Sequence, residues 1–115
     1  MTDDELNKAM AERVMGYQKV TVVELTRDYW SDNEGGLQSA CEDWNPVTNA
    51  NDALRVVEAM EKKGWYLQML VDSFYRFVCF YKDGSGDKRA GLKGVFEIPR
   101  AICEASAKAE GVWHE

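Results

Sequence analysis

Apolar residues recur at the three-and-four spacing of a helix with one buried face in three stretches of the chain. The first stretch begins with a T-x-x-E capping box at Thr2 and Glu5. The second ends at Gly64, after two lysines that suit the negative end of a helix dipole. The third follows Pro99, which a helix tolerates in its first turn, and carries small residues that allow close packing. We therefore predict helices over about 3–15, from a Thr48 cap to about 63, and over 98–109.

Runs of β-branched and aromatic residues predict strands at 19–26, 65–72 and 74–82, and a weaker one at 91–96 follows a flexible turn at 83–87. The run at 74–82 is apolar on both of its faces, which is typical of a central strand in a sheet covered on both sides. These elements predict an α+β fold, a three-layer α-β-α sandwich. Its mainly antiparallel sheet has three to four strands, and about three helices cover it.

Residues 27–48 show no such periodicity and contain Gly35-Gly36 near their middle. A loop longer than about 15 residues is uncommon in a compact domain and is often functional. Aromatic residues within the stretch, Tyr29 and Trp30 among them, can hold it against the core. We expect an ordered loop that can include a short helical turn at 37–41.

The net charge of −6 is concentrated in one segment of this chain of 115 residues, for which we predict a single domain over 1–115. From Asp28 through Leu54 there are six acids and neither lysine nor arginine, so binding to a phosphate backbone is disfavoured there. Neither a run of about 18 apolar residues nor a basic, apolar N-terminus is present, so neither a membrane span nor a signal peptide is predicted. An odd number of cysteines favours reduced thiols and a cytoplasmic location; they are Cys41, Cys79 and Cys103.

The residues capable of chemistry form no recognisable catalytic or metal motif. The three cysteines lack the short C-x2–4-C spacing of zinc sites. His114, the sole histidine, lies one residue from the end, which disfavours a nucleophile–base pair. Asp28, Asp32 and Glu34 are closely spaced but lack the D-x-[DN]-x-[DN]-G pattern of a calcium loop. We expect no catalytic residue, no metal site, no cofactor and no enzymatic activity.

Three segments nevertheless resemble one known family in residue type, order and spacing. Residues 11–17, AERVMGY, resemble the A-E-K-V-M-G-W run that opens the phage ABA-sandwich domain family. Residues 44–46, WNP, followed by the acidic and apolar pattern of 52–58, resemble its W-x-P and A-x-x-V-V-E-K segments. Residues 98–105, IPRAICEA, are similar to its closing P-x-A-I-C-x-A element.

This resemblance implies a small phage or prophage protein with an α-β-α layered fold, working in the cytoplasm of the bacterial host. It implies no established catalytic residues. Two positions depart from the family pattern: Tyr17 replaces the usual Trp, and Leu54 stands where an aromatic is common. The acidic stretch at 27–43 aligns with no family motif, so the resemblance transfers no ligand to it.

The acidic stretch supports two interpretations. Its tryptophans can pack onto the core beneath a solvated loop, or they can anchor a partner inside an acidic rim. Under the second, the chain is a non-enzymatic interaction protein that binds a basic protein surface, as an inhibitor of a host defence system would. The partner-binding residues are then Trp30, Asp32, Glu34, Glu42, Asp43 and Trp44.

Other functions remain open at this stage. A small-ligand binder could stack a nucleotide-like molecule in a pocket formed by Trp65, Tyr66, Tyr75 and Arg76. A structural or accessory role in the virion is a third interpretation. Homodimers are also conceivable, through a free strand edge near Lys19 or Gly91.

Overall fold

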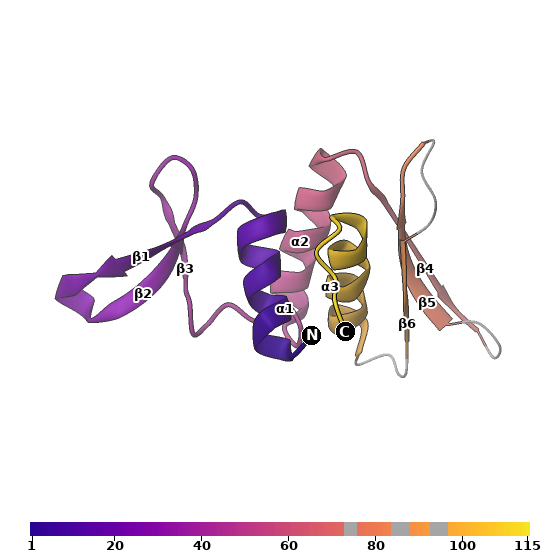
Figure 1. Cartoon of the computed structure of the whole chain (residues 1–115), viewed down its shortest axis with the longest axis horizontal. Coiled ribbons are helices and arrows are strands. Elements are labelled where there is room, and N and C mark those ends of the chain that lie inside the picture. The colour runs from indigo at the N-terminus through magenta and orange to yellow at the C-terminus, as the bar shows by residue number, and fades with distance from the viewer. Residues whose placement is uncertain (73–75, 84–87, 93–96) are drawn as a thin grey trace.

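The structure, a computed structural model, describes residues 1–72, 76–83, 88–92 and 97–115. Figure 1 shows the helices in the middle of the molecule, with one three-stranded antiparallel sheet on either side of them. The molecule is elongated, with a longest extent of 52 Å against 29 and 24 Å in the other directions. The predicted α+β class, the three helices and the antiparallel pairing are confirmed.

The helices lie close to their predicted positions because their end signals are local. α1 spans Asp3–Ala9 and continues as a π-helical turn over Met10–Val14; the predicted capping box joins Thr2 and Glu5. α2 spans Ala50–Lys62 and α3 spans Ile98–Ala109. The expected cap of α2 is wrong by one position. Asn49 accepts the amide hydrogen of Asp52 at 3.1 Å, because a turn at 45–49 precedes the helix.

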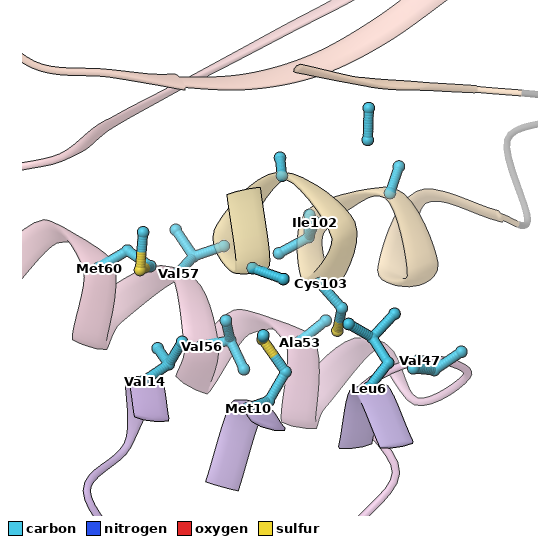
Figure 2. Close-up of a cluster of buried hydrophobic side chains, with 14 of the residues drawn as sticks. Leu6, Met10, Val14, Val47, Ala53, Val56, Val57, Met60, Ile102 and Cys103 are labelled. Carbon is cyan, nitrogen blue, oxygen red and sulfur yellow. The ribbon is translucent and has the colours of Figure 1, made fainter. Parts of the chain in front are cut away.

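The three helices share one hydrophobic core (Figure 2). Leu6, Met10 and Val14 project from the first helical segment towards α2 and α3. α3 is buried on several sides at once, because the sheet covers one side and the other helices the rest. Its alanines and the fully buried Ser106, whose hydroxyl donates to the carbonyl of Ile102 at 2.7 Å, permit this close packing.

The sheet at the C-terminal side contains β4 (Tyr66–Val71), β5 (Arg76–Tyr81) and β6 (Lys88–Gly91), with β5 in the centre as predicted. Val78 and Phe80 are fully buried on the side that α3 covers. On the opposite face, Tyr66 and Tyr81 are 54% and 38% exposed. Apolar residues on both faces of β5 predicted helices on both faces; instead the described helices cover one face only, and they form the middle layer.

The third strand of this sheet begins earlier in the chain than predicted. The weaker strand expected at 91–96 is observed at Lys88–Gly91, where Val78 pairs with Ala90. Residues 93–96, most of the turn at 83–87 and the junction at 73–75 lie outside the described residues.

The other sheet is formed by β1 (Gln18–Val22), β2 (Arg27–Ser31) and β3 (Leu37–Ala40), and residues 18–40 are called the wing below. The prediction of an irregular loop from 27 is wrong for β2 and β3, as is the helical turn at 37–41. The sequence pattern does not indicate these two strands, because they bury few residues. In addition, the β2–β3 register shifts between Trp30 and Ser31, which interrupts the alternation of buried and exposed residues.

Candidate functional site

Two tryptophans in the core connect the wing to the helices: Trp30 belongs to the wing, and Trp44 follows it in the chain. Trp30 is 6% exposed and Trp44 only 3%. The indole N–H of Trp44 donates to the carbonyl of Asn7 at 2.8 Å, and its ring meets Tyr17 edge-on at 5.8 Å between centroids. The interpretation in which these tryptophans pack onto the core is therefore the one that the structure supports, because neither ring is free to anchor a partner.

Arg55 of α2 makes the second attachment. Its guanidinium donates to the hydroxyl of Tyr17 at 3.0 Å and to the side chain of Gln38 in β3 at 3.2 Å. It also lies over the Trp44 ring, 5.5 Å from the centroid. One side chain thus joins α2, the wing and the aromatic pair beneath it.

Asp32, a predicted contact residue, organises the turn between β2 and β3. Its carboxylate accepts the backbone N–H groups of Gly36 at 2.8 Å and Glu34 at 2.9 Å, and the side-chain amide of Gln38 at 2.8 Å. These bonds, that from Gly36 first, lower the pKa of Asp32 below its ordinary value because they favour the charged form. A Cβ at position 36 would lie 2.9 Å from an Asp32 oxygen, so this close approach requires glycine.

The other predicted acids differ in their partners. Glu42 and Asp43 both pair with Arg27 at the start of β2, and Asp28 pairs with Lys19 across the β1–β2 hairpin. Glu34 is exposed and makes no ion pair within the described part of the chain. The structure therefore places Glu34, Glu42 and Asp43 at the surface, but Glu42 and Asp43 both pair with Arg27.

The outer end of the wing exposes apolar residues that the sequence analysis assigned to a strand. A 3-10 turn over Val23–Leu25 joins β1 to β2, and Val23 and Leu25 are 75% and 53% exposed. Thr26 follows with φ +51°, a left-handed conformation that is strained for a β-branched residue. In the sequence, the adjacent pair Val22-Val23 indicates that the strand ends near this point, because two consecutive apolar residues interrupt the alternation of a half-buried strand.

A cleft of about 720 Å³ separates the wing from the first helical segment. Tyr17, Trp30 and Trp44 contribute to its lining. Its charged lining residues are the cations Lys8 and Lys19 and the acids Asp4, Glu12 and Glu42. The half-buried Cys41 also lies there, and burial raises the pKa of its thiol above the ordinary value. No sequence signal indicated this cleft, because its residues come from segments that only the tertiary fold brings together.

Of the residues predicted as a small-ligand pocket, the three that the structure describes do not come together. Tyr66 pairs with Tyr81 at one end of the β4–β5 hairpin, whereas Arg76 pairs with Val71 at the other. Trp65 is buried, with the ammonium of Lys82 4.7 Å from its ring centroid. Tyr75 lies outside the described residues. The length of the hairpin thus keeps Tyr66 and Arg76 apart.

Within the described residues, neither a cluster of three or more metal-ligating side chains nor a helix long and apolar enough to cross a bilayer is found. The buried Cys103 has a pKa far above its ordinary value because of desolvation, which makes it a poor nucleophile.

The comparison with protein families matches residues 8–107 of the chain to the model described as the phage ABA sandwich domain. Neither the comparison with curated proteins nor the comparison with solved structures returns a match. The family match runs from the end of α1 through most of α3 and therefore includes the wing, α2 and the second sheet. By this match, the chain belongs to the phage ABA sandwich domain family.

Proposed function

We propose that this protein is a non-enzymatic phage interaction protein that binds a basic protein surface through its wing. Such binding would inhibit a host protein, and a defence protein that normally holds nucleic acid is the class whose surface suits an acidic ligand. The observation that carries the proposal is the exposed apolar pair at the outer end of the wing, Val23 and Leu25.

The position of this pair supports a contact role. The wing extends away from the helices along the long axis of the molecule, and the β1–β2 hairpin forms its outer end (Figure 1). Single exposed apolar residues are ordinary on protein surfaces. Two of them on one short turn, at the most accessible end of a projecting sheet, are an arrangement that can enter an apolar pocket on a partner.

The charge of the wing and of the residues that follow it supports a basic partner. Residues 18–44 contain six acids and two bases, and both bases are already paired with acids of the same segment. Glu24 lies between the two exposed apolar residues, and Glu34 is exposed on the β2–β3 turn, at the opposite end of β2 from the tip. A partner with lysine and arginine around an apolar pocket would match this pattern, and charge attraction would speed its association.

The backbone at the tip adds a third argument. A β-branched residue with positive φ is strained by roughly 1–2 kcal/mol, and glycine at the same position would remove the strain. Thr26 adopts this conformation immediately after the exposed turn. Strained backbone persists at contact sites when it presents neighbouring side chains in a required orientation.

The test is capture of host proteins with two matched variants. In the tip variant, Val23 and Leu25 are both replaced by serine. In the control, Leu54→Ser alters a side chain that is similarly exposed, at 56%, but lies on α2. We expect a host protein that the wild type and the control retain and that the tip variant binds at least tenfold more weakly. If every protein captured by the wild type is also captured by the tip variant, the proposal is wrong.

A second pair of variants tests the charge. Glu24→Gln with Glu34→Gln removes two wing carboxylates, whereas Glu58→Gln with Glu61→Gln removes two from α2 and leaves the same net charge. With the captured partner in purified form, the wing pair should lower the association rate and its salt dependence more than the α2 pair does. Equal effects of the two pairs would contradict a contact through the wing. Asp32 is left intact because it holds the β2–β3 turn.

The cleft beside the wing favours a second candidate function, the binding of a small anionic aromatic ligand such as a nucleotide. Its volume of about 720 Å³ lies within the range of small-molecule sites, and aromatic rings, two lysines and three acids line it. The ligand's ring would contact the accessible edges of these aromatic side chains, while Lys8 or Lys19 meets its phosphate.

The half-buried thiol of Cys41 provides the test of this second candidate. A nucleotide in the cleft should slow the alkylation of Cys41, and Lys8→Gln with Lys19→Gln should abolish that protection. Protein binding through the wing tip would leave the alkylation rate unchanged by nucleotides. A panel of nucleotides that gives no protection at millimolar concentration would exclude this function.

A further inference from the structure

β4 is an exposed sheet edge of unusual composition. It forms one side of the order β4-β5-β6, and no described element pairs with its outer edge. Residues 64–71, GWYLQMLV, contain no charge and no proline. Several of its apolar side chains are open to solvent: Tyr66, Met69, Leu70 and Val71 are between 36% and 54% exposed. An edge of this kind readily pairs with another strand, because its backbone donors and acceptors lack partners.

The remaining sheet edges carry features that oppose such pairing. β1 contains Lys19, and β6 contains Lys88 and Arg89. β3 is only four residues long and pairs with β2 across an irregular register. Charges, short length and bulges are the devices by which proteins protect a free edge. Only β4, among the described strands at a sheet edge, combines full length with the absence of charge.

We propose that β4 pairs antiparallel with β4 of a second copy of this chain, which joins the two C-terminal sheets into one six-stranded sheet. A charged partner surface would have nothing to recognise on this edge, whereas a second copy supplies the same uncharged, apolar strand. Two chains of net charge −6 repel each other, so a contact between them is favoured where neither presents an acid. β4 meets that condition.

The two-fold symmetry of such a pair determines its register. An axis perpendicular to the sheet keeps each residue on its own face, so only residues of the same face can lie opposite each other. Centring the axis on Gln68 places Tyr66 opposite Leu70 and leaves Asp72 outside the paired strand. Centring it on Met69 would place Asp72 opposite Tyr66. At the first position, the two Gln68 amides face each other, and each can donate to and accept from the other.

The pairing is compatible with the proposed contact through the wing. The wing and the C-terminal sheet lie at opposite ends of the molecule (Figure 1), so pairing at β4 leaves both wings uncovered. Because the axis keeps each face of the sheet on its own side, both wings would project from the helix-covered side of the six-stranded sheet. A six-residue edge is smaller than a standard interface, which buries about 800 Å² on each partner. We therefore expect a dimer that dissociates on dilution.

The experiment measures the mass of the full chain by light scattering and sedimentation over a wide range of protein concentration. The wild type should change from one chain of 13.1 kDa to two as the concentration rises. Gln68→Lys and Gln68→Glu should each raise the dissociation constant at least tenfold, because identical charges would lie opposite each other. An equimolar mixture of the two variants should restore the dimer, and native mass spectrometry should identify one copy of each variant within it.

Gln18→Lys and Gln18→Glu are the matched controls, since Gln18 is an exposed glutamine on the edge strand β1 and the variants have the same net charges. They should dimerise as the wild type does. Circular dichroism and thermal unfolding of all four variants check that the fold is retained. A wild type that stays monomeric at millimolar concentration overturns the proposal, as do Gln68 variants that dimerise normally. A mixture that stays monomeric overturns the register at Gln68.

Discussion

The two sheets of this protein have the same size and the same antiparallel order, yet they are stabilised differently. The C-terminal sheet buries Val78 and Phe80 completely against α3. The wing buries only residues at its base, Trp30, Ser31 and Ala40, and leaves its outer hairpin in solvent. A three-stranded sheet therefore becomes part of the core only where a helix covers one of its faces.

The energetic consequence follows from the kinds of contact involved. Each fully buried Phe or Val contributes roughly 1.5–3 kcal/mol relative to an exposed one. The exposed ion pairs of the wing, such as Lys19 with Asp28, contribute at most about 1 kcal/mol each. We infer that the C-terminal sheet and helices determine global stability, whereas the wing is held by a few anchoring side chains and can open separately.

The largest effect should come from Phe80→Ala, which leaves a cavity against α3 and should lower the free energy of unfolding by about 3–5 kcal/mol. Tyr81→Ala is the matched control, because it removes a neighbouring aromatic that is 38% exposed and packs on Tyr66. Tyr81→Ala should lower the free energy of unfolding by only about 1 kcal/mol. Urea titration measures both. Similar losses for the two variants would show that the outer face is as well covered as the inner one.

Trp30→Ala should loosen the wing selectively. Removal of a buried tryptophan lowers stability by about 3 kcal/mol or more. We expect most of this loss to appear as easier local opening of the wing, so that amide exchange in β1–β3 becomes roughly a hundredfold faster. Exchange in β4–β6 should stay near the wild-type rate. Hydrogen exchange followed by mass spectrometry separates the two sheets by peptide. Equal acceleration in both would mean that the wing and the core unfold as one unit.

A smaller effect is expected at Arg55, which connects α2 to the wing. Arg55→Met removes its bonds to Tyr17 and Gln38, and should destabilise the wing by about 1 kcal/mol. Tyr17→Phe removes one of the same bonds. Because both changes delete a shared interaction, the double variant should lose less than the two single losses added together. Strict additivity, measured by hydrogen exchange in β3, would exclude the bridging role.

The smallest effect concerns acid pH and the turn at 32–36. The folded-state pKa of Asp32 is lowered, so its bonds contribute fully above the ordinary value near 4 and are lost as the pH falls through the lower folded value. Amide resonances of Glu34 and Gly36 should therefore shift only as the pH falls below about 4, through the lowered pKa of Asp32. Asp32→Asn cannot titrate and should show no such shift. Identical titrations of the two proteins would assign the change to other acids.

The sequence alone was sufficient for the helices, because their signals are local. The capping box at Thr2 and the glycine at position 64 gave boundaries within a few residues, and the spacing of apolar residues identified the buried faces. Two adjacent strands of the C-terminal sheet were also predictable from continuous apolar runs. Of the wing strands, β1 lies largely within the strand predicted at 19–26. β2 and β3 were not predicted, because their identity depends on hydrogen bonds to other strands and on little burial of their own.

For the candidate site, the sequence located the acidic segment but did not predict the structural roles of its residues. Composition alone could not show that Asp32 closes a turn, that Trp30 and Trp44 lie in the core, or that Val23 and Leu25 are exposed. Charge and periodicity are properties of neighbouring residues, and the chain determines them directly. Exposure depends on what packs across from a residue, and here only the tertiary arrangement, which places helices beside one sheet and solvent around the tip of the other, decided it.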